Sequence, residues 1–210
     1  MQDETWKDKP FVSYVLIGIN VIVFFFSNNI RAFYELGTLN VEGVLINHEY
    51  GRFIWSMFLH SGVDHIFSNM LCLFFIGTMV EKEFGHFSYT FVYFLSGIGG
   101  GMFSLYMKIR THSMAGSVGA SGALFGLDGV LLAMVLLYRS PLPTVTPLRV
   151  ILMIALSAYS GFTTSNVDNA AHLGGLFVGM LAGALICAFK RIRRNHSGKR
   201  SEKKENHFEY

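Results

Sequence analysis

Charged residues are scarce in this chain, and their scarcity excludes most soluble architectures. Only 15% of the 210 residues are Asp, Glu, Lys or Arg, whereas an average soluble domain has roughly 25%. Carboxylates are the rarest group, because only Asp128 and Asp168 occur between Phe84 and Ser201. So few acidic groups over such a length leave little surface that could face water. The composition therefore favours a membrane protein.

Cysteine and proline are also rare, with two and four residues. Cys72 and Cys187 both lie in apolar runs, which favours a packing role over a disulfide or a zinc site. The net charge of +3 arises in the tail after Phe189, so no basic surface for nucleic acid is indicated. The first apolar run lacks a following small-residue cleavage site, and we expect it to be retained as a membrane helix.

Long apolar segments, in contrast, are abundant. A hydrocarbon layer about 30 Å thick needs roughly 20 apolar residues per helix. Six segments qualify, and the cluster of prolines before the fifth marks a loop: Phe11 to Phe26, Ile54 to Val80, Phe87 to Met107, Ser121 to Tyr138, Leu148 to Phe162, and Ala170 to Phe189. The predicted fold class is an all-α membrane protein, a bundle of six helices with a long interfacial first loop.

Basic residues predict the orientation and the domain limits. Six spans place both termini on one side, and this side would hold most of the Lys and Arg residues, including all those from Lys190 onward. Basic loops stay in the cytoplasm, so we expect residues 1–10 to be a cytoplasmic N-terminus. Residues 11–189 form the membrane domain, and residues 190–210 form a basic cytoplasmic tail that we expect to be disordered. No internal repeat or second domain is evident.

The stretch "GASGALFG", residues 119–126, places a serine at the start of the fourth predicted helix. The preceding "HSMAGSVGA" is too polar for a lipid-facing helix, so it is expected to be irregular chain shielded by protein. Free N–H groups at a helix N-terminus favour a developing negative charge near Ser121. Helix packing is the alternative, because Gly122 and Gly126 form a small-xxx-small pair.

The sixth predicted helix carries His172 near its outer end, followed on one face by Gly175, Gly179 and Gly183. A face without side chains allows close approach of a neighbouring helix, and the glycines of the fourth helix offer a matching surface. A base within hydrogen-bond reach of a hydroxyl can activate it as a nucleophile. A buried histidine satisfied by a carbonyl is the alternative. We expect a valine at Gly122 or Gly175 to separate the two helices.

The second predicted helix contains "HSGVDHIFSN", in which His65 and Asn69 are four residues apart on one face. Both can donate hydrogen bonds, as the stabilisation of an oxyanion requires. A metal site formed by His60 and His65 is a weaker interpretation, since a spacing of five differs from that of the zinc helices. His60 is instead expected to brace the first loop.

These three motifs, in this order and on these helices, resemble the rhomboid intramembrane serine proteases, in a minimal six-helix bacterial-type form. The resemblance implies that Ser121 is the nucleophile and His172 the general base of a dyad. It implies that His65, Asn69 and the backbone N–H of Ser121 bind the oxyanion. Gly119, which opens the serine motif, belongs to the supporting residues. Membrane protein substrates would be cleaved near the outer face of a bacterial plasma membrane, without metal or cofactor.

Two positions depart from the family pattern. Phe125 stands where many members carry a tyrosine that stacks on the histidine, so stacking is retained and the hydroxyl is lost. Arg52 fits a pair common in the first loop but Gly51 does not, so this loop is expected to be anchored differently. A catalytically silent, client-binding adaptor or chaperone is the alternative function. A transporter is disfavoured by the absence of a repeated half.

Asp128 has no place in these motifs. It lies seven residues after Ser121, roughly 10 Å deeper along the helix. An ionised carboxylate at that depth is costly, so we expect a neutral, hydrogen-bonded acid with a structural role. A water-linked, pH-sensitive element beneath the site is the alternative.

Overall fold

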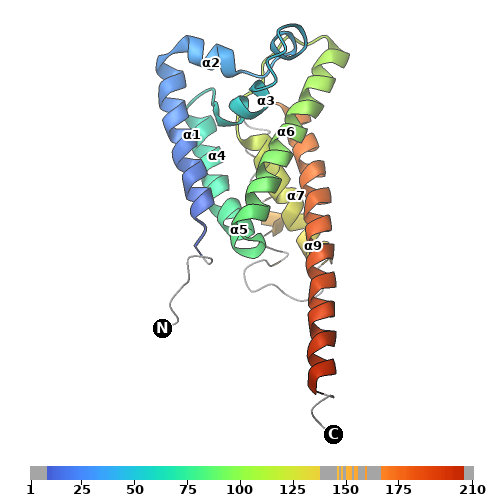
Figure 1. Ribbon diagram of the computed structural model, residues 1–210. Helices are drawn as coiled ribbons and strands as arrows, with labels where there is room; N and C mark the ends of the chain where they lie inside the picture. The colour runs from blue at the N-terminus through green and yellow to red at the C-terminus, as the bar shows by residue number, and fades with distance from the viewer. Residues whose placement is uncertain are drawn as a thin grey trace.

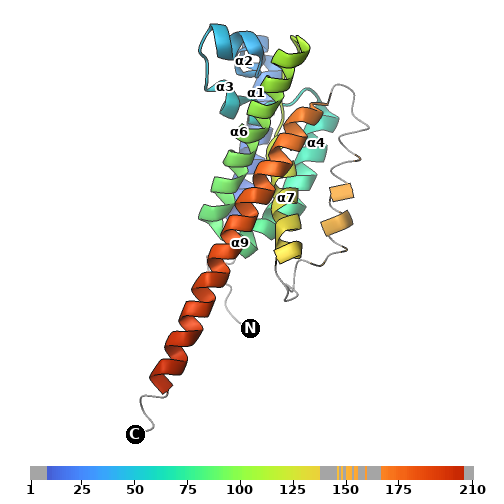
Figure 2. The same cartoon turned by 90° about the vertical axis from the view of Figure 1, so that its right-hand side faces the viewer.

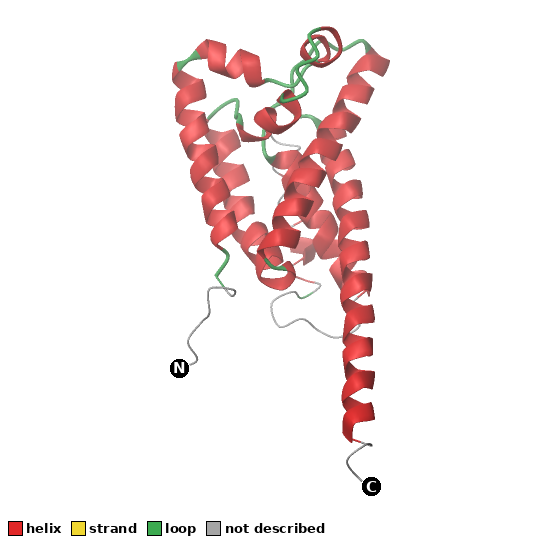
Figure 3. Cartoon of the chain, in the orientation of Figure 1, coloured by secondary structure: helices red, strands yellow, loops and turns green. Residues whose placement is uncertain are grey.

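The computed structural model describes residues 9–137 and 167–205, a few isolated positions between 146 and 159, and side chains as far as residue 191. Helices make up nearly all of this part (Figures 1 and 3). In chain order they are α1 (Phe11–Asn29), α2 (Arg31–Gly37), η2 (Glu42–Ile46), α3 (Arg52–Trp55), η3 (Ser56–Phe58), α4 (Val63–Cys72), η4 (Leu73–Gly77), α5 (Thr78–Phe84), α6 (His86–Thr111), α7 (Ser121–Leu137) and α9 (Asn169–Glu205).

Four continuous helical segments of the described residues are long and apolar enough to cross a membrane: Phe11–Asn29, Val63–Phe84, His86–Thr111 and Asn169–Arg191. A fifth apolar helix, Ser121–Leu137, is shorter. Together they correspond to five of the six predicted segments. The predicted segment from Leu148 to Phe162 falls largely outside the described residues, so the count of six stays a prediction.

The second predicted helix begins later than the sequence indicates. Its apolar run starts at Ile54, yet the membrane helix starts at Val63. The chain between them makes two short turns, α3 and η3, and then extends through Gly62, which has φ 178° and ψ 174°. Hydropathy alone does not separate these turns from the helix, because their residues are also apolar. The prediction of one helix from Ile54 is therefore wrong.

Helix α7 lies at the centre of the bundle and packs against α6 and α9 (Figure 2). Most of its side chains are buried, as expected for a helix that is apolar on every face. Glycines allow the contact with α9: a Cβ added at Gly175 would overlap the carbonyl oxygen of Gly122, and one at Gly179 would overlap that of Gly126. This close backbone packing confirms the predicted pairing of the fourth and sixth helices.

Gly122 and Gly175 are not equivalent in this contact. A Cβ at Gly122 would meet its nearest atom, the carbonyl oxygen of Ala171, at 3.6 Å, an ordinary contact. At Gly175 and Gly179 the α9 backbone therefore approaches the carbonyls of α7, whereas further along the contact a Cβ at Gly129 of α7 would overlap the carbonyl oxygen of Leu176. Space for a small side chain exists at Gly122 and not at Gly175.

The first loop is anchored by Arg52, which is buried. Its guanidinium donates to the carbonyl oxygens of Glu35 at 2.8 Å and Thr38 at 2.6 Å, and to the Glu49 carboxylate at 2.6 Å. A Cβ at Gly43 would overlap this guanidinium. Arg52 therefore links the segment before η2 to the segment after it. A Cβ added at the neighbouring Gly51 would have no atom within 4 Å.

At the opposite end of the bundle, buried Glu81 of α5 holds the start of α1. Its carboxylate accepts hydrogen bonds from the backbone N–H groups of Val12 and Ser13, at 2.9 and 2.8 Å, and from the Ser13 hydroxyl at 2.6 Å. A carboxylate at a helix N-terminus satisfies free N–H groups and complements the helix dipole. The same carboxylate pairs with His86 at 2.7 Å.

Helix α9 is much longer than the bundle and extends past it (Figures 1 and 2). The start of α1 and the end of α9 lie at the same end of the molecule (Figure 1). The helix continues to Glu205 and so covers most of the segment for which the sequence predicts disorder. The first loop lies at the other end, which we call the loop end, and this is where α7 and α9 both begin.

Candidate active site

Ser121 is the first residue of α7, and the chain before it is irregular, as predicted. Two residues between the end of α6 and Ser121 have positive φ, His112 at 52° and Gly119 at 124°. Glycine suits the second position because a side chain there would be strained and its Cβ would lie 2.8 Å from Nε2 of His65. The helix thus starts with its free N–H groups and its serine facing the cavity described below.

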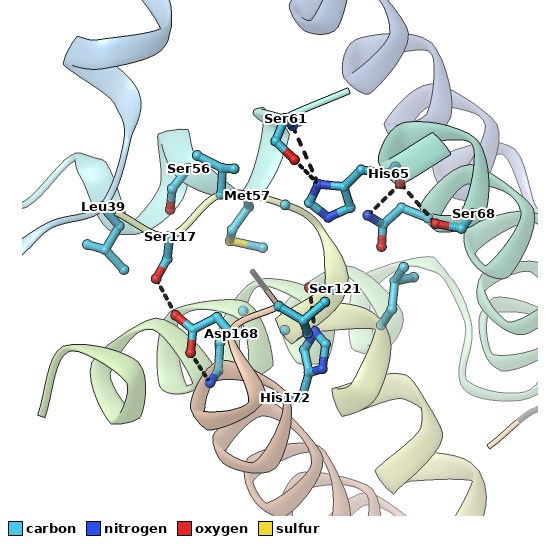
Figure 4. Close-up of a pocket in the computed structure, with 18 of the residues that line it drawn as sticks. Leu39, Ser56, Met57, Ser61, His65, Ser68, Ser117, Ser121, Asp168 and His172 are labelled. Atoms are coloured by element: carbon cyan, nitrogen blue, oxygen red, sulfur yellow. Dashed lines mark hydrogen bonds between the residues drawn. The ribbon is translucent and has the colours of Figure 1, made fainter. Parts of the chain in front are cut away.

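His172 lies in the first turn of α9 and reaches across to α7. Its Nε2 is 2.8 Å from Oγ of Ser121, so a neutral ring with Nε2 as the acceptor takes a hydrogen bond from the hydroxyl (Figure 4). The ring is 6% exposed and stacks on Phe125, with centroids 4.1 Å apart and planes inclined by 10°. The stacking expected from the sequence is present without a tyrosine hydroxyl.

His65 and Asn69 lie across the cavity from the Ser121–His172 pair. Nδ1 of His65 is 3.1 Å from Oγ of Ser61, and this contact leaves Nε2 directed toward Gly119 (Figure 4). The amide nitrogen of Asn69 donates to the carbonyl oxygen of His65 at 2.9 Å. Because an amide has two N–H groups, one remains for a ligand. Two side-chain donors therefore line the side opposite the base.

A cavity of about 560 Å³ joins these groups. Ser121, His172, His65 and Asn69 all line it, together with polar loop residues and apolar residues that include Met57 and Cys72. The Ser121 hydroxyl, the two imidazoles and the Asn69 amide thus share one cavity inside an apolar bundle.

His60 lies behind His65 and has 2% exposure. The two rings meet edge to face with centroids 5.0 Å apart. Burial, reinforced by the neighbouring His65, lowers the pKa of His60 to about 3, so the ring is neutral at physiological pH. Among the residues that the structure describes, no group of three or more His, Cys, Asp and Glu side chains is arranged to hold a metal ion.

The residues that the sequence assigns a supporting role lie in different parts of the molecule. Gly119 and Gly122 line the cavity, and Gly175 sets the contact between α7 and α9. Arg52 acts in the first loop, where it orders backbone. Asp128 is fully buried on α7.

Sequence reasoning assigned no role to Asp168, which lies four residues before His172. Its carboxylate accepts hydrogen bonds from Lys108 and Ser104 of α6 and from Ser117 of the loop before α7. Burial alone would raise the pKa of Asp168, but these hydrogen bonds outweigh it and lower the pKa to about 2. The rarity of carboxylates in this half of the chain is the sequence feature that could have drawn attention to Asp168.

The fold and the site define an all-helical membrane protein with a serine–histidine pair in an internal cavity. A family model, described as the Rhomboid domain, matches residues 47–189. This match covers more than half of the chain, which therefore belongs to the rhomboid family.

Several curated relatives are similar over most of this chain. RHOMBOID-like protein 1 of Arabidopsis thaliana is 40% identical over 71% of the chain and 38% of its own length. Rhomboid protease GluP of Bacillus subtilis is 31% identical over 85% of the chain and 35% of its own length. Rhomboid protease AarA of Providencia stuartii is 33% identical over 68% of the chain and 58% of its own length. The chain thus spans less than two thirds of the length of each of these relatives.

Proposed function

We propose that this protein is an intramembrane serine endopeptidase with Ser121 as nucleophile and His172 as general base. The observation that carries the proposal is the 2.8 Å contact between Oγ of Ser121 and Nε2 of His172. The names of two relatives, which are rhomboid proteases, support a proteolytic function.

The reaction follows from the positions of these atoms. Oγ of Ser121 attacks the carbonyl carbon of the scissile peptide bond while its proton moves to Nε2 of His172. The tetrahedral intermediate collapses, the C–N bond breaks, and His172 returns the proton to the leaving amine. A water molecule then gives a proton to His172 and attacks the acyl-enzyme, which releases the carboxylate and restores the Ser121 hydroxyl.

The negative charge of the intermediate would lie between Ser121 and the opposite wall of the cavity. The backbone N–H of Ser121 is among the free N–H groups of the first turn of α7, and the helix dipole favours an anion there. His65 and Asn69 provide donors from α4. Donors that are already oriented need no reorganisation when the charge develops. This arrangement supports their proposed role as the oxyanion site.

The site lies at the loop end of the bundle. This position supports the proposal that substrates enter from the membrane and are cleaved near one of its faces. We infer that these substrates are membrane-spanning proteins. The concentration of basic residues beyond Lys190 supports a cytoplasmic position for the end of α9, and therefore an outer position for the site. The relatives come from a plant as well as from bacteria, so they do not support the expected bacterial membrane.

Co-expression with a panel of tagged single-span membrane proteins tests the proposal. We expect the wild type to cleave at least one of them near the outer end of its span, and Ser121→Ala to cleave none. Ser27→Ala is the matched control, because the hydroxyl of this buried serine donates to the carbonyl oxygen of Phe24 in its own helix. Its products should equal those of the wild type.

The same experiment distinguishes the alternative function. A client-binding adaptor would retain tagged proteins on purification, and wild type and Ser121→Ala would retain them equally without any fragment. Cleavage that persists in Ser121→Ala would contradict the assignment of the nucleophile.

A further inference from the structure

A cluster of four polar side chains occupies the loop end beside the cavity and takes no part in the proposed chemistry. Lys108 Nζ lies 2.5 Å from Oδ2 of Asp168 and 2.6 Å from Oγ of Ser104. Ser104 and Ser117 also donate to the same carboxylate oxygen, and Ser117 contacts Lys108. The Lys108 and Asp168 side chains are only 11% and 21% exposed, so the pair is largely removed from water.

This cluster joins three segments that are far apart in sequence. Lys108 and Ser104 lie in the last turns of α6, Ser117 lies in the loop that leads to the nucleophile, and Asp168 immediately precedes α9. Asp168 and Ser117 both reach the cavity wall (Figure 4). One carboxylate therefore contacts both chain segments that deliver the two reactive side chains.

Next to His172, Asp168 caps the first turn of α9. Its Oδ1 accepts the backbone N–H of Ala171 at 3.0 Å, and its carbonyl oxygen accepts that of His172 at 3.2 Å. These are the hydrogen bonds of a helix N-cap. The position of the carboxylate thus fixes where the helix begins, and His172 lies one turn later.

On the side of the nucleophile, Ser117 fixes the loop. Its backbone forms a two-way bridge with Leu39 of the first loop, with N···O distances of 2.8 and 3.1 Å, while its hydroxyl binds Asp168. Two residues later, the N–H of Gly119 donates to the carbonyl oxygen of Ser56 at 2.9 Å. The loop before Ser121 is therefore held from both sides.

We propose that the Lys108–Asp168 ion pair, with Ser117, is a positioning element that keeps Ser121 and His172 within hydrogen-bond distance. This inference rests on the proposed function. The cluster acts through the loop and the helix N-terminus and does not touch the reacting atoms. Both carboxylate oxygens are already occupied, and in the described part of the chain no hydrogen bond joins them to the His172 ring, so Asp168 is not the third member of a triad.

The test compares Lys108→Met, Asp168→Asn and the double variant with the wild type in detergent. Labelling by a fluorophosphonate probe measures the reactivity of Ser121 without the need for a known substrate. Small displacements of catalytic groups can lower rates by roughly 100-fold, so we expect each single variant to label between about 10-fold and 100-fold more slowly.

The double variant should label faster than Lys108→Met, because it leaves no unpaired buried charge. A purely structural role would lower the melting temperature and leave the labelling rate of the folded protein unchanged. Glu35→Gln is the matched control, since it breaks the exposed Arg31–Glu35 pair at a similar distance, 2.7 Å, and should change neither property. Wild-type labelling rates in both single variants would overturn the inference.

If the single variants do not fold, Ser117→Ala decides, because it keeps the Lys108–Asp168 ion pair and removes the hydroxyl contacts that tie the loop to the cluster. We expect slower labelling at an unchanged melting temperature, and an unchanged rate overturns the inference. Hydrogen exchange of residues 113–119 in a Ser121→Ala background gives a readout independent of activity. Faster exchange after Lys108→Met supports the cluster even if wild-type Ser121 is never labelled, a result that would refute only the proposed function.

Discussion

Asn69 makes one structural hydrogen bond, and we propose that it also has a chemical role. One amide N–H is used on the carbonyl oxygen of His65, at 2.9 Å, and the second is left at the cavity. The first bond lies within α4, and we propose that the second N–H serves an oxyanion. The two uses predict different consequences of losing the amide.

We predict that Asn69→Ala lowers kcat by about 10²–10³, the usual effect of removing one oxyanion donor, while the protein stays folded. Asn29→Ala is the matched control, because its amide makes the same bond four residues back on α1, to Phe25, but lies at the surface. Cleavage assays with a slowly cleaved substrate, together with melting temperatures, make the comparison. Full activity of Asn69→Ala would remove this residue from the oxyanion site.

The burial of His60 predicts that the stability of the protein depends on pH. Its pKa is about 3 in the folded protein and about 6.5 in an unfolded chain, so between these values the unfolded state binds a proton that the folded state does not. The free energy of unfolding should therefore fall as the pH is lowered from 6.5 toward 3. His60→Asn should show a weaker decline over pH 4.5 to 6.5 in thermal denaturation. Equal slopes for the two proteins would contradict the buried, neutral state of His60.

At the scale of helices, we predict different effects on stability for substitutions of Gly175 in α9 and Gly122 in α7. Gly175→Ala should strongly lower the melting temperature, because the new Cβ overlaps the carbonyl oxygen of Gly122 and overpacking costs about 1–3 kcal/mol. Gly122→Ala should be close to neutral, since its Cβ finds space near Ala171. Thermal unfolding of both variants in the same detergent tests this difference. Equal destabilisation would mean that the helix contact is described incorrectly.

The elements that the sequence predicts well are those set by local pattern. Apolar runs located the four long apolar helices and the shorter α7, and glycine spacing paired α7 with α9. The start of α4 was missed because the turns before Gly62 are as apolar as the helix. The asymmetry between Gly122 and Gly175 depends on helix rotation, which spacing does not determine.

In the candidate site, too, the sequence predicted the parts that lie in short motifs and missed the parts that do not. Short motifs predicted that Ser121 and His172 meet, since each lies at the start of a helix whose partner could be inferred. The cluster of Lys108, Ser117 and Asp168 was missed because its members are up to 60 positions apart and share no motif. Only the fold brings them to one end of the bundle.

At the scale of the whole molecule, polar groups are concentrated at the two ends of an apolar bundle. Glu81 and His86 fix the end at which α1 begins, and the loop end holds Arg52, the Lys108–Asp168 pair and the cavity. Buried polar groups are stable only when they are hydrogen-bonded, so each of these clusters joins several segments. The membrane-spanning part between them is mostly apolar, with buried Asn20 of α1 and Asp128 of α7 as exceptions, and the Ser121–His172 pair lies toward the loop end.

The central claim is that Ser121 and His172 act as one chemical unit, and fluorophosphonate labelling of the purified protein tests it most directly. We predict that the wild type is labelled at Ser121, as mapped by mass spectrometry of the modified peptide. Ser121→Ala should not be labelled, and His172→Ala should be labelled far more slowly. In cleavage assays the double variant should be no worse than either single variant, because the effects of groups that act as a unit are not additive. A label on another residue, or wild-type labelling of His172→Ala, would contradict the account.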